Sequence, residues 1–431
     1  MGLKIMYMKV FVQCSIAFFL CAMSSAQFDI NYEETEVPEF KVPEPLTTFS
    51  GERISIPQEW DTKRRPEVYE FFERKVYGKV PGPLDKVTFK TLEEGNNALG
   101  GKALRKQVEI TLLKNGKSIR FTLLIYLPKG VSYIPIFLGY NFHGNHTVTA
   151  EDEVLISNAW SMNNASLNID NHKLTAASRG GRAHRWAVDN IIEKGFGLAT
   201  IYYGEIDPDK SDMNDGIHAL FYEKGQERPK RDEWGSLSAW AFGYSKALDY
   251  LLTDDAIDPT KVIVFGHSRL GKAALWAAAS DQRFAGAISN NSGCGGAALS
   301  KRRFGETINV INTQFPHWFC HNFKGYNNNE EALPVDQHLL LALVAPRPLY
   351  VASAKEDQWA DPQGEFLSAY HTSKVYELFH KKGISEAQLP EIQQPIQNTV
   401  AYHLRAGKHD VTEYDWEQYL IWAHKMFNIN P

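Results

Sequence analysis

Cysteine is scarce in this chain. Only four of its 431 residues are Cys, and two of those lie in an apolar N-terminal segment, which leaves Cys294 and Cys320 for the rest of the chain. A chain of this length can bury a large core without disulfides. The two cysteines could form one disulfide in an oxidising compartment, but we favour two buried thiols.

The chain also lacks a strong excess of charge of one sign. Its formal net charge is −5, which argues against nucleic acid or an anionic membrane as a partner. Internal repeats and low-complexity segments are missing, and 43% hydrophobic with 23% charged residues fits one large domain. The 24 Phe, 19 Tyr and 10 Trp suit sugar-stacking surfaces, although most aromatic residues pack in cores. We expect a monomer.

The first 26 residues have the pattern of a cleavable signal peptide. Lys4 and Lys9 precede an apolar stretch, Val10 to Met23, that is too short to span a bilayer, and Ser24 to Ala26 forms a small-residue cleavage site. We predict cleavage before Gln27 and a secreted or periplasmic protein. No later stretch is long and apolar enough to cross a membrane. Residues 27–46, with six acids and three prolines from residue 29 on, predict an extended arm.

The most informative segment runs from Val262 to Ala274 and reads VIVFGHSRLGKAA. A buried strand, a tight Gly-His-Ser turn and a small-residue helix follow each other in the order of a nucleophile elbow, which makes Ser268 the predicted nucleophile of an α/β-hydrolase fold. We assign residues 47–431 to this single domain. Arg269 places a cation beside the point where negative charge would develop, and Lys272 lies about one helical turn further on.

A nucleophilic serine needs a base and an orienting acid, which in this fold follow later strands in the order Ser, Asp/Glu, His. The apolar segment 348–354 leads into Glu356 and Asp357, and the apolar segment 399–404 leads into His409. An aromatic-rich helix follows His409. Among the 14 histidines, His409 is therefore the candidate base.

Other segments predict the remainder of an α/β sheet. We expect two strands of an antiparallel edge at residues 105–113 and 119–128. Two inner strands are expected at residues 134–140 and 195–203, and a helix at residues 236–252. Two long polar excursions, residues 143–185 and 204–234, follow carboxyl ends of strands, where ligands bind in such sheets. They should wall the cleft around Ser268.

Two histidine pairs raise the question of a metal site. His317 and His321 flank an aromatic run, and His143 and His146 lie in a polar loop. Neither pair has the spacing of a zinc motif with a third ligand nearby. We predict no metal and no cofactor.

Six motifs together resemble the bacterial glucuronoyl esterases, carbohydrate esterase family 15. The motifs are Gly266–Lys272, Asn291–Gly296, Pro334–His338, Ala345–Arg347, Glu356–Pro362 and Gly407–His409, and the similarity covers essentially the whole mature chain. The resemblance implies cleavage of the ester between a 4-O-methyl-glucuronic acid side chain of xylan and a lignin alcohol, with no cofactor.

Carried over to this sequence, the resemblance implies Ser268 as the nucleophile, Arg269 as the oxyanion stabiliser and His409 as the base. The residues implied to hold the uronate are Lys272, Glu306, Gln314 and Trp359.

One position departs from the pattern of the fungal members. Those enzymes, and some bacterial members, carry a glutamate as the triad acid where this chain has Asn291. An amide cannot stabilise an imidazolium as a carboxylate does. The acid must then follow the next strand. We choose Asp357, whose spacing to Trp359 matches an Asp-x-Trp pattern of the family, with Glu356 in reserve.

Two alternatives stay open. Another carbohydrate esterase, such as an acetyl-xylan esterase, would share the triad but would leave Lys272, Glu306 and Trp359 unexplained. A non-catalytic carbohydrate-binding protein on a hydrolase fold would not need the triad that this chain retains.

Overall fold

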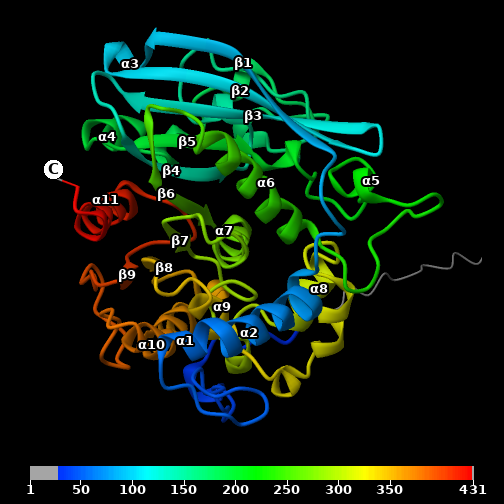
Figure 1. Cartoon of the computed structure of the whole chain (residues 1–431), viewed down its shortest axis with the longest axis vertical. Coiled ribbons are helices and arrows are strands. Elements are labelled where there is room, and N and C mark those ends of the chain that lie inside the picture. Colours follow the sequence, from blue (N-terminus) through cyan, green and yellow to red (C-terminus); the bar gives the residue numbers. More distant parts are fainter. Residues whose placement is uncertain (1–27, 430–431) are drawn as a thin grey trace, which may run out of the picture.

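A nine-stranded sheet forms the middle of the molecule (Figure 1). The computed structural model describes residues 28–429, so the predicted signal peptide, residues 1–26, lies outside the described residues. The strand order is β1-β2-β3-β5-β4-β6-β7-β8-β9; β1, β2, β3 and β5 pair antiparallel in turn, and all neighbours from β5 to β9 are parallel. The strands are β1 Lys86–Asn97, β2 Ala103–Lys114, β3 Lys117–Pro128, β4 Ile134–Asn141, β5 Gly197–Tyr202, β6 Ile257–His267, β7 Gly286–Asn290, β8 Leu349–Ala354 and β9 Val400–Arg405.

Helices cover both faces of the sheet. A buried hydrophobic cluster lies on each face, and alternate residues of β6 point into different clusters. Val262 and Val264 belong to the first cluster, and Ile263 and Phe265 to the second. The second cluster is closed by α4 and α11, and the first by α2, α6, α7, α9 and α10. The helices are α1 Pro57–Glu59, α2 Arg65–Phe72, α3 Ala98–Gly101, α4 Val188–Glu193, α5 His218–Phe221, α6 Ser236–Leu251, α7 Arg269–Ser280, α8 Ile308–Gln314, α9 Gln337–Ala342, α10 Pro362–Leu378 and α11 Glu413–Phe427.

This architecture confirms the α/β-hydrolase class and its antiparallel edge. The sequence pattern did not indicate β1, which lies at the end of the sheet and is paired on one side only. Most of its residues are exposed or half-buried. Because neither face of β1 is deeply buried, its sequence carries no clear period-two alternation of apolar residues.

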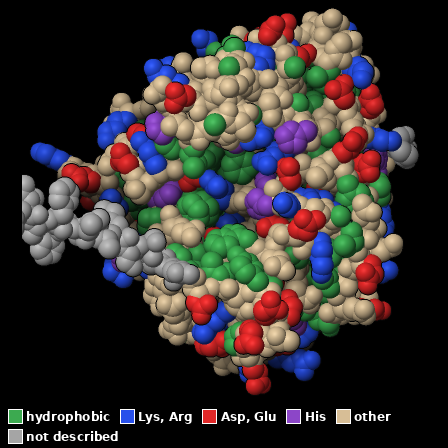
Figure 2. Space-filling view, turned by 180° about the vertical axis from the view of Figure 1, so that it is seen from behind, with side chains coloured by type: hydrophobic (Ala, Val, Ile, Leu, Met, Phe, Trp, Pro, Cys, Tyr) green, Lys and Arg blue, Asp and Glu red, His purple; other side chains and the backbone are tan. Residues whose placement is uncertain are grey.

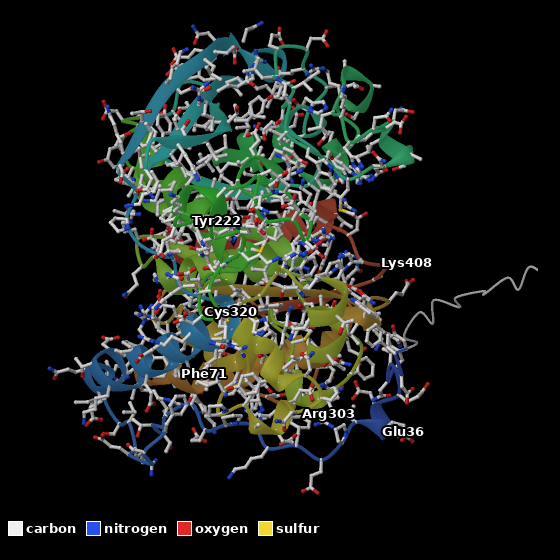
Figure 3. The ribbon with its side chains drawn as sticks, turned by 90° about the vertical axis from the view of Figure 1, so that its right-hand side faces the viewer. Glu36, Phe71, Tyr222, Arg303, Cys320 and Lys408 are labelled. Atoms are coloured by element: carbon white, nitrogen blue, oxygen red, sulfur yellow. The ribbon has the colours of Figure 1, made fainter. Side chains whose placement is uncertain are left out.

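The N-terminal arm lies against the segment that follows β7. Its residues from 28 to 46 are largely extended, apart from a short 3-10 helix, Glu34–Glu36, and a turn at residues 45–46. The Asn31 carbonyl accepts from the Gly305 N–H at 2.8 Å, and Glu34 pairs with the buried Arg302 at 2.8 Å. Figure 3 shows the arm beside the segment that carries Arg303.

Two further expectations from the sequence concern the state of the two cysteines and the absence of a membrane-spanning segment. Cys294 and Cys320 are both free and buried, as the preferred interpretation had it. Among residues 28–429, no helix combines the length and the apolar character that a membrane crossing requires.

The turn between β6 and α7 places Ser268 at the carboxyl edge of the sheet. Ser268 has φ 58° and ψ −132°, a left-handed conformation that costs a non-glycine residue free energy. Its N–H donates to the Asn290 carbonyl at 2.9 Å, which ties the turn to the end of β7. A Cβ on Gly266 would lie 2.0 Å from the Leu270 carbonyl oxygen, so only glycine allows the helix to pack this closely on the strand.

Gly266→Ala should therefore lower the free energy of unfolding by more than about 3 kcal/mol, as expected for overpacking against rigid backbone. Gly325→Ala is the matched control, because nothing lies within 4 Å of its added Cβ. Chemical denaturation of both variants measures the difference. Equal stability of the two variants would contradict the described turn.

Candidate active site

Ser268 stands at the N-terminus of α7. The first backbone N–H groups of a helix have no partner within the helix, and the helix dipole makes this end positive. The Arg269 N–H is the first of these donors. When Ser268 Oγ adds to a carbonyl carbon, the negative charge that develops on the carbonyl oxygen would therefore form beside both the Arg269 N–H and the positive helix end.

His409 and Asp357 form a hydrogen-bonded pair. His409 Nδ1 lies 2.6 Å from Asp357 Oδ2; the Asp357 carboxylate is buried, whereas the His409 side chain is 40% exposed. The loops after β8 and β9 meet through two backbone hydrogen bonds, from Lys355 to Arg405 at 2.9 Å and from Glu356 to Gly407 at 3.1 Å. These bonds explain why two residues 52 positions apart meet.

The reserve acid is placed differently. Glu356 is exposed, and its side chain makes no hydrogen bond to any residue between 28 and 429. The structure thus brings Asp357, and not Glu356, to His409. Asn291, which the resemblance placed at the position of the fungal glutamate, is buried and makes no side-chain hydrogen bond within the described chain.

The Arg269 guanidinium is held away from bulk solvent by an acid and by aromatic rings. Its Nη1 pairs with Asp209, and its centre lies 5.0 Å from the Trp318 ring, 5.5 Å from Phe142 and 5.9 Å from Phe315. Such a setting fixes the orientation of the cation next to Ser268.

Asp209 is a site residue that the sequence pattern did not reveal. It accepts from His317 Nε2 at 2.8 Å and from Trp318 Nε1 at 2.7 Å. Although burial raises the pKa of Asp209, the His317 hydrogen bond, the Arg269 charge and Trp318 together hold that pKa well below its usual value. His317, considered above as a metal ligand, is therefore bound to a carboxylate instead.

A pocket of about 330 Å³ opens on one side of Ser268, and we call it the Lys272 pocket. Lys272 Nζ donates to the carbonyls of Ser292 and Cys294 at 2.7 and 2.6 Å, and its third neighbour, Glu306 Oε2, is 3.4 Å away. The lining comprises Ser268, Arg269, Lys272, Asn291, Ser292, Gly293, Glu306, Phe315, Trp318, Asp357, Trp359, Ala360 and His409. Burial raises the pKa of Glu306, despite the opposing Lys272 charge.

The structure assembles three of the four predicted sugar contacts in this pocket. Lys272, Glu306 and Trp359 line it, and the Glu306 N–H donates to the Trp359 carbonyl at 3.0 Å. Gln314 does not line it: this residue is exposed at the last turn of α8, and the following Phe315 faces the pocket instead.

A second pocket, of about 230 Å³, opens on another side of Ser268, and we call it the Met162 pocket. Its lining comprises Phe142, His143, Met162, Asn163, Asn164, Arg185, Tyr203, His267, Ser268, Arg269 and His409. Five of these residues lie within the excursion 143–185, and Phe142 and Tyr203 border the two excursions. No residue of the excursion 204–234 lines either pocket, so the cleft-wall prediction is confirmed for the first excursion only. In Figure 2, histidine, basic and hydrophobic side chains gather along a hollow across the middle of the face shown, and the same residue types line both pockets.

Comparisons with known proteins identify the family. Residues 186–380 match the model of the family described as "Glucuronyl esterase, fungi". The chain is 49% identical over 394 residues to "Carbohydrate esterase MZ0003" from an unknown prokaryotic organism, a match that covers 91% of each chain. This chain belongs to the glucuronoyl esterases of carbohydrate esterase family 15.

Solved structures agree with this assignment. A promiscuous CE15 esterase from a marine bacterial metagenome superposes with a TM-score of 0.87 at 48% identity, covering 92% of this chain and 100% of the other. A glucuronoyl esterase from Solibacter usitatus gives 0.86 at 46% identity, covering 91% and 100%. The chain is thus a carboxylic ester hydrolase, as the resemblance implied.

A second buried acid, Glu365 of α10, supports the loop after β7 in this family member. One of its oxygens accepts from the N–H groups of Ser292 and Gly293 at 2.7 and 3.0 Å, and the other lies 2.6 Å from Ser353 Oγ. Burial raises the pKa of Glu365 to about 8, although the three hydrogen bonds oppose the rise. No local sequence signal marks this residue, because only the fold brings it under the loop.

The raised pKa of Glu365 predicts a pH dependence of stability. The folded protein holds this proton up to about pH 8, whereas an unfolded chain would lose it near the usual glutamate value, about 4.3. The contribution of Glu365 to stability is therefore complete below the unfolded pKa and is lost as the pH rises toward 8, with a slope of at most about 1.4 kcal/mol per pH unit.

Glu365→Gln should flatten this part of the profile, because the amide resembles the protonated acid and does not titrate. Denaturation at intervals from pH 5 to 9, for the wild type and the variant, measures the difference. Parallel profiles would show that Glu365 is ionised in the folded protein.

Proposed function

We propose that this enzyme is a serine esterase that hydrolyses esters of glucuronic acid and 4-O-methyl-glucuronic acid, in particular those joining glucuronoxylan to lignin alcohols. The observation that carries the proposal is the 2.6 Å pair of His409 and Asp357, set with Ser268 in the wall of the Lys272 pocket. The family assignment supports the ester chemistry.

The proposed reaction begins with acylation of Ser268. His409 takes the proton from Ser268 Oγ as that oxygen attacks the uronoyl carbonyl, while Asp357 orients the imidazole and stabilises its charged form. The oxyanion forms against the Arg269 N–H and guanidinium. The alcohol then leaves with the proton that His409 carries.

Water completes the proposed cycle. It attacks the acyl carbon, gives one proton to His409, and the bond between that carbon and Ser268 Oγ breaks as His409 returns the proton to the serine. All groups required are side chains and one backbone N–H of this chain.

The uronate ring is proposed to occupy the Lys272 pocket. Two hydrogens of the Lys272 ammonium are directed at backbone carbonyls and the third faces Glu306 Oε2, 3.4 Å away, so a sugar hydroxyl is proposed to bind beside this pair. Such a hydroxyl can accept from Lys272 and donate to Glu306 at once. Trp359 offers an indole surface on the same wall, and Gln314 stays a prediction without a place in the pocket.

The alcohol is proposed to leave through the Met162 pocket, which Phe142, Met162 and Tyr203 make partly apolar. This character suits an aromatic alcohol better than a free sugar. The proposed partner is thus plant cell-wall glucuronoxylan with its lignin-linked esters, met by a monomeric, secreted or periplasmic enzyme.

The two alternative functions, an acetyl-xylan esterase and a non-catalytic carbohydrate-binding protein, each leave features of the site unexplained. An acetyl-xylan esterase needs room for an acetyl group only, and about 330 Å³ beside Ser268 far exceeds that need. A carbohydrate-binding protein without catalysis has no use for the buried Asp357 beside His409. The promiscuity ascribed to one relative does favour side activity on small esters.

The acid assignment gives one prediction. Asp357→Asn should lower kcat on benzyl glucuronate by about two to four orders of magnitude, because His409 loses its orienting charge. Glu356→Gln is the matched control and should change kcat less than about twofold, since that side chain is exposed. If the effects are reversed, Glu356 is the acid.

The proposed contact between Glu306 and the sugar gives a second prediction. Glu306→Gln should lower kcat/KM on methyl glucuronate about tenfold, the loss expected for a charged hydrogen-bond acceptor. Hydrolysis of p-nitrophenyl acetate should stay within about twofold, because acetate offers no hydroxyl for Glu306 to bind. Equal losses on the two substrates would assign Glu306 to the general electrostatics of the site.

A further inference from the structure

A second histidine lies beside the proposed base. His267 immediately precedes Ser268, is 5% exposed, and lines the Met162 pocket together with Ser268 and His409. The centroids of the His267 and His409 rings are 4.5 Å apart. The reaction described above uses His409 alone.

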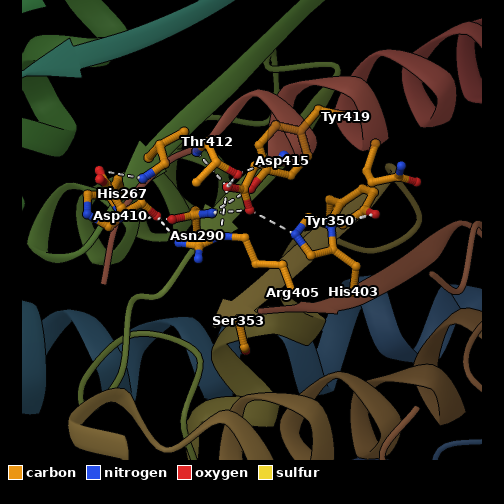
Figure 4. Close-up of polar contacts among 12 residues, drawn as sticks. His267, Asn290, Tyr350, Ser353, His403, Arg405, Asp410, Thr412, Asp415 and Tyr419 are labelled. Atoms are coloured by element: carbon orange, nitrogen blue, oxygen red, sulfur yellow. Dashed lines mark hydrogen bonds and ion pairs between the residues drawn. The ribbon is translucent and has the colours of Figure 1, made fainter. Parts of the chain in front are cut away.

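The hydrogen bonds around Asn290 determine which nitrogen of His267 carries the proton. Asn290 Nδ2 donates to the Asp415 carboxylate at 3.1 Å, so Asn290 Oδ1 must be the atom that lies 2.7 Å from His267 Nδ1 (Figure 4). An amide oxygen only accepts. His267 Nδ1 is therefore protonated, and Nε2 of a neutral ring carries a lone pair.

Asp415 is fixed as a carboxylate. It accepts from His403 Nε2 and from Arg405 Nε, each at 2.9 Å, and it closes the capping box of α11 with Thr412 (Figure 4). Burial raises the pKa of Asp415, but the hydrogen bond and charge of His403 and the charge of Arg405 lower it below the usual value. An ionised Asp415 cannot donate, which keeps the amide of Asn290 in its orientation.

The His267 ring is held neutral by its surroundings. Burial lowers its pKa well below the usual value, and the neighbouring positive charge of His409, when protonated, lowers it further. His267 Nε2 makes no hydrogen bond to any residue in the described part of the chain, while the ring borders the Met162 pocket. The pocket thus contains an acceptor that the protein itself does not use.

We infer that His267 is a further catalytic residue, whose Nε2 accepts a hydrogen bond from the water that hydrolyses the acyl-enzyme. This inference rests on the proposed function. In deacylation, water occupies the position left by the alcohol, gives one proton to His409 and directs its other O–H to His267. The departing alcohol has carbon in place of that second hydrogen, so acylation does not use His267.

The partition of the acyl-enzyme between water and methanol tests this role. Benzyl glucuronate with added methanol yields glucuronate by hydrolysis and methyl glucuronate by methanolysis. His267→Asn keeps an amide N–H near the Nδ1 position to bind Asn290, but removes the Nε2 acceptor. We expect the ratio of hydrolysis to methanolysis to fall about tenfold, because methanol has no second O–H to donate.

Two further variants serve as controls. His267→Gln places a carboxamide oxygen near the Nε2 position and should recover most of the wild-type ratio. His338→Asn makes the same substitution at another buried histidine, whose Nε2 binds the Pro43 carbonyl outside both pockets, and should leave the ratio unchanged. An unchanged ratio in His267→Asn, or equal losses of both products, would overturn the proposed role.

Two results separate this role from the proposed function and from a folding defect. If the wild type forms no methyl glucuronate, the acyl-enzyme itself is in doubt. If His267→Asn does not fold, nitrogen NMR of the wild-type histidines still decides: we expect a neutral ring with the proton on Nδ1, and a proton on Nε2 of His267 at neutral pH would overturn the inference.

Discussion

The turn from β6 into α7 is the constraint on which the site depends. Gly266 lets the helix approach the strand so closely that any side chain there would strike the Leu270 carbonyl. The turn holds Ser268 at a left-handed φ of 58° and directs the N-terminus of α7 at the atom that the serine would attack. Every other group of the site is positioned relative to this turn.

Two buried acidic residues, Glu365 and Asp415, hold the surrounding loops in place. Glu365 gathers the loop after β7, which in turn supplies the carbonyls that bind Lys272. Asp415 binds Arg405, whose guanidinium donates to the carbonyls of the loop that carries His409, at distances of 2.6 to 2.9 Å. The loops after β7 and β9 thus reach Ser268 as parts of a buried polar network, so little reorganisation is needed when charge develops.

Those parts of the site that depend on residues close together in the sequence could be predicted from the sequence. The strand, turn and helix around Ser268 follow each other within 13 residues, and the positions of Asp357 and His409 follow from the order of strands in the fold. The alternative between Asp357 and Glu356 required the structure, because adjacent residues differ there only in the direction of their side chains.

Other features had no local signal. Asp209 meets Arg269 across 60 positions, and Asn290 meets Asp415 across 125, so neither pair forms a motif. The family resemblance implied a sugar contact for Gln314, but α8 ends at that residue and leaves it exposed. Strand β1 was not predicted because it lies at the sheet edge, with little burial to impose an alternating pattern.

Covalent labelling tests the central claim, that Ser268 is the nucleophile of a hydrolytic site. An alkyl fluorophosphonate should attach once per chain, on the peptide that contains Ser268, and esterase activity should fall in proportion to the label. Glucuronate should slow the labelling by occupying the Lys272 pocket. Mass spectrometry of the digested protein locates the adduct. Full labelling at Ser268 with activity retained, or loss of activity with the label on another residue, would contradict the account.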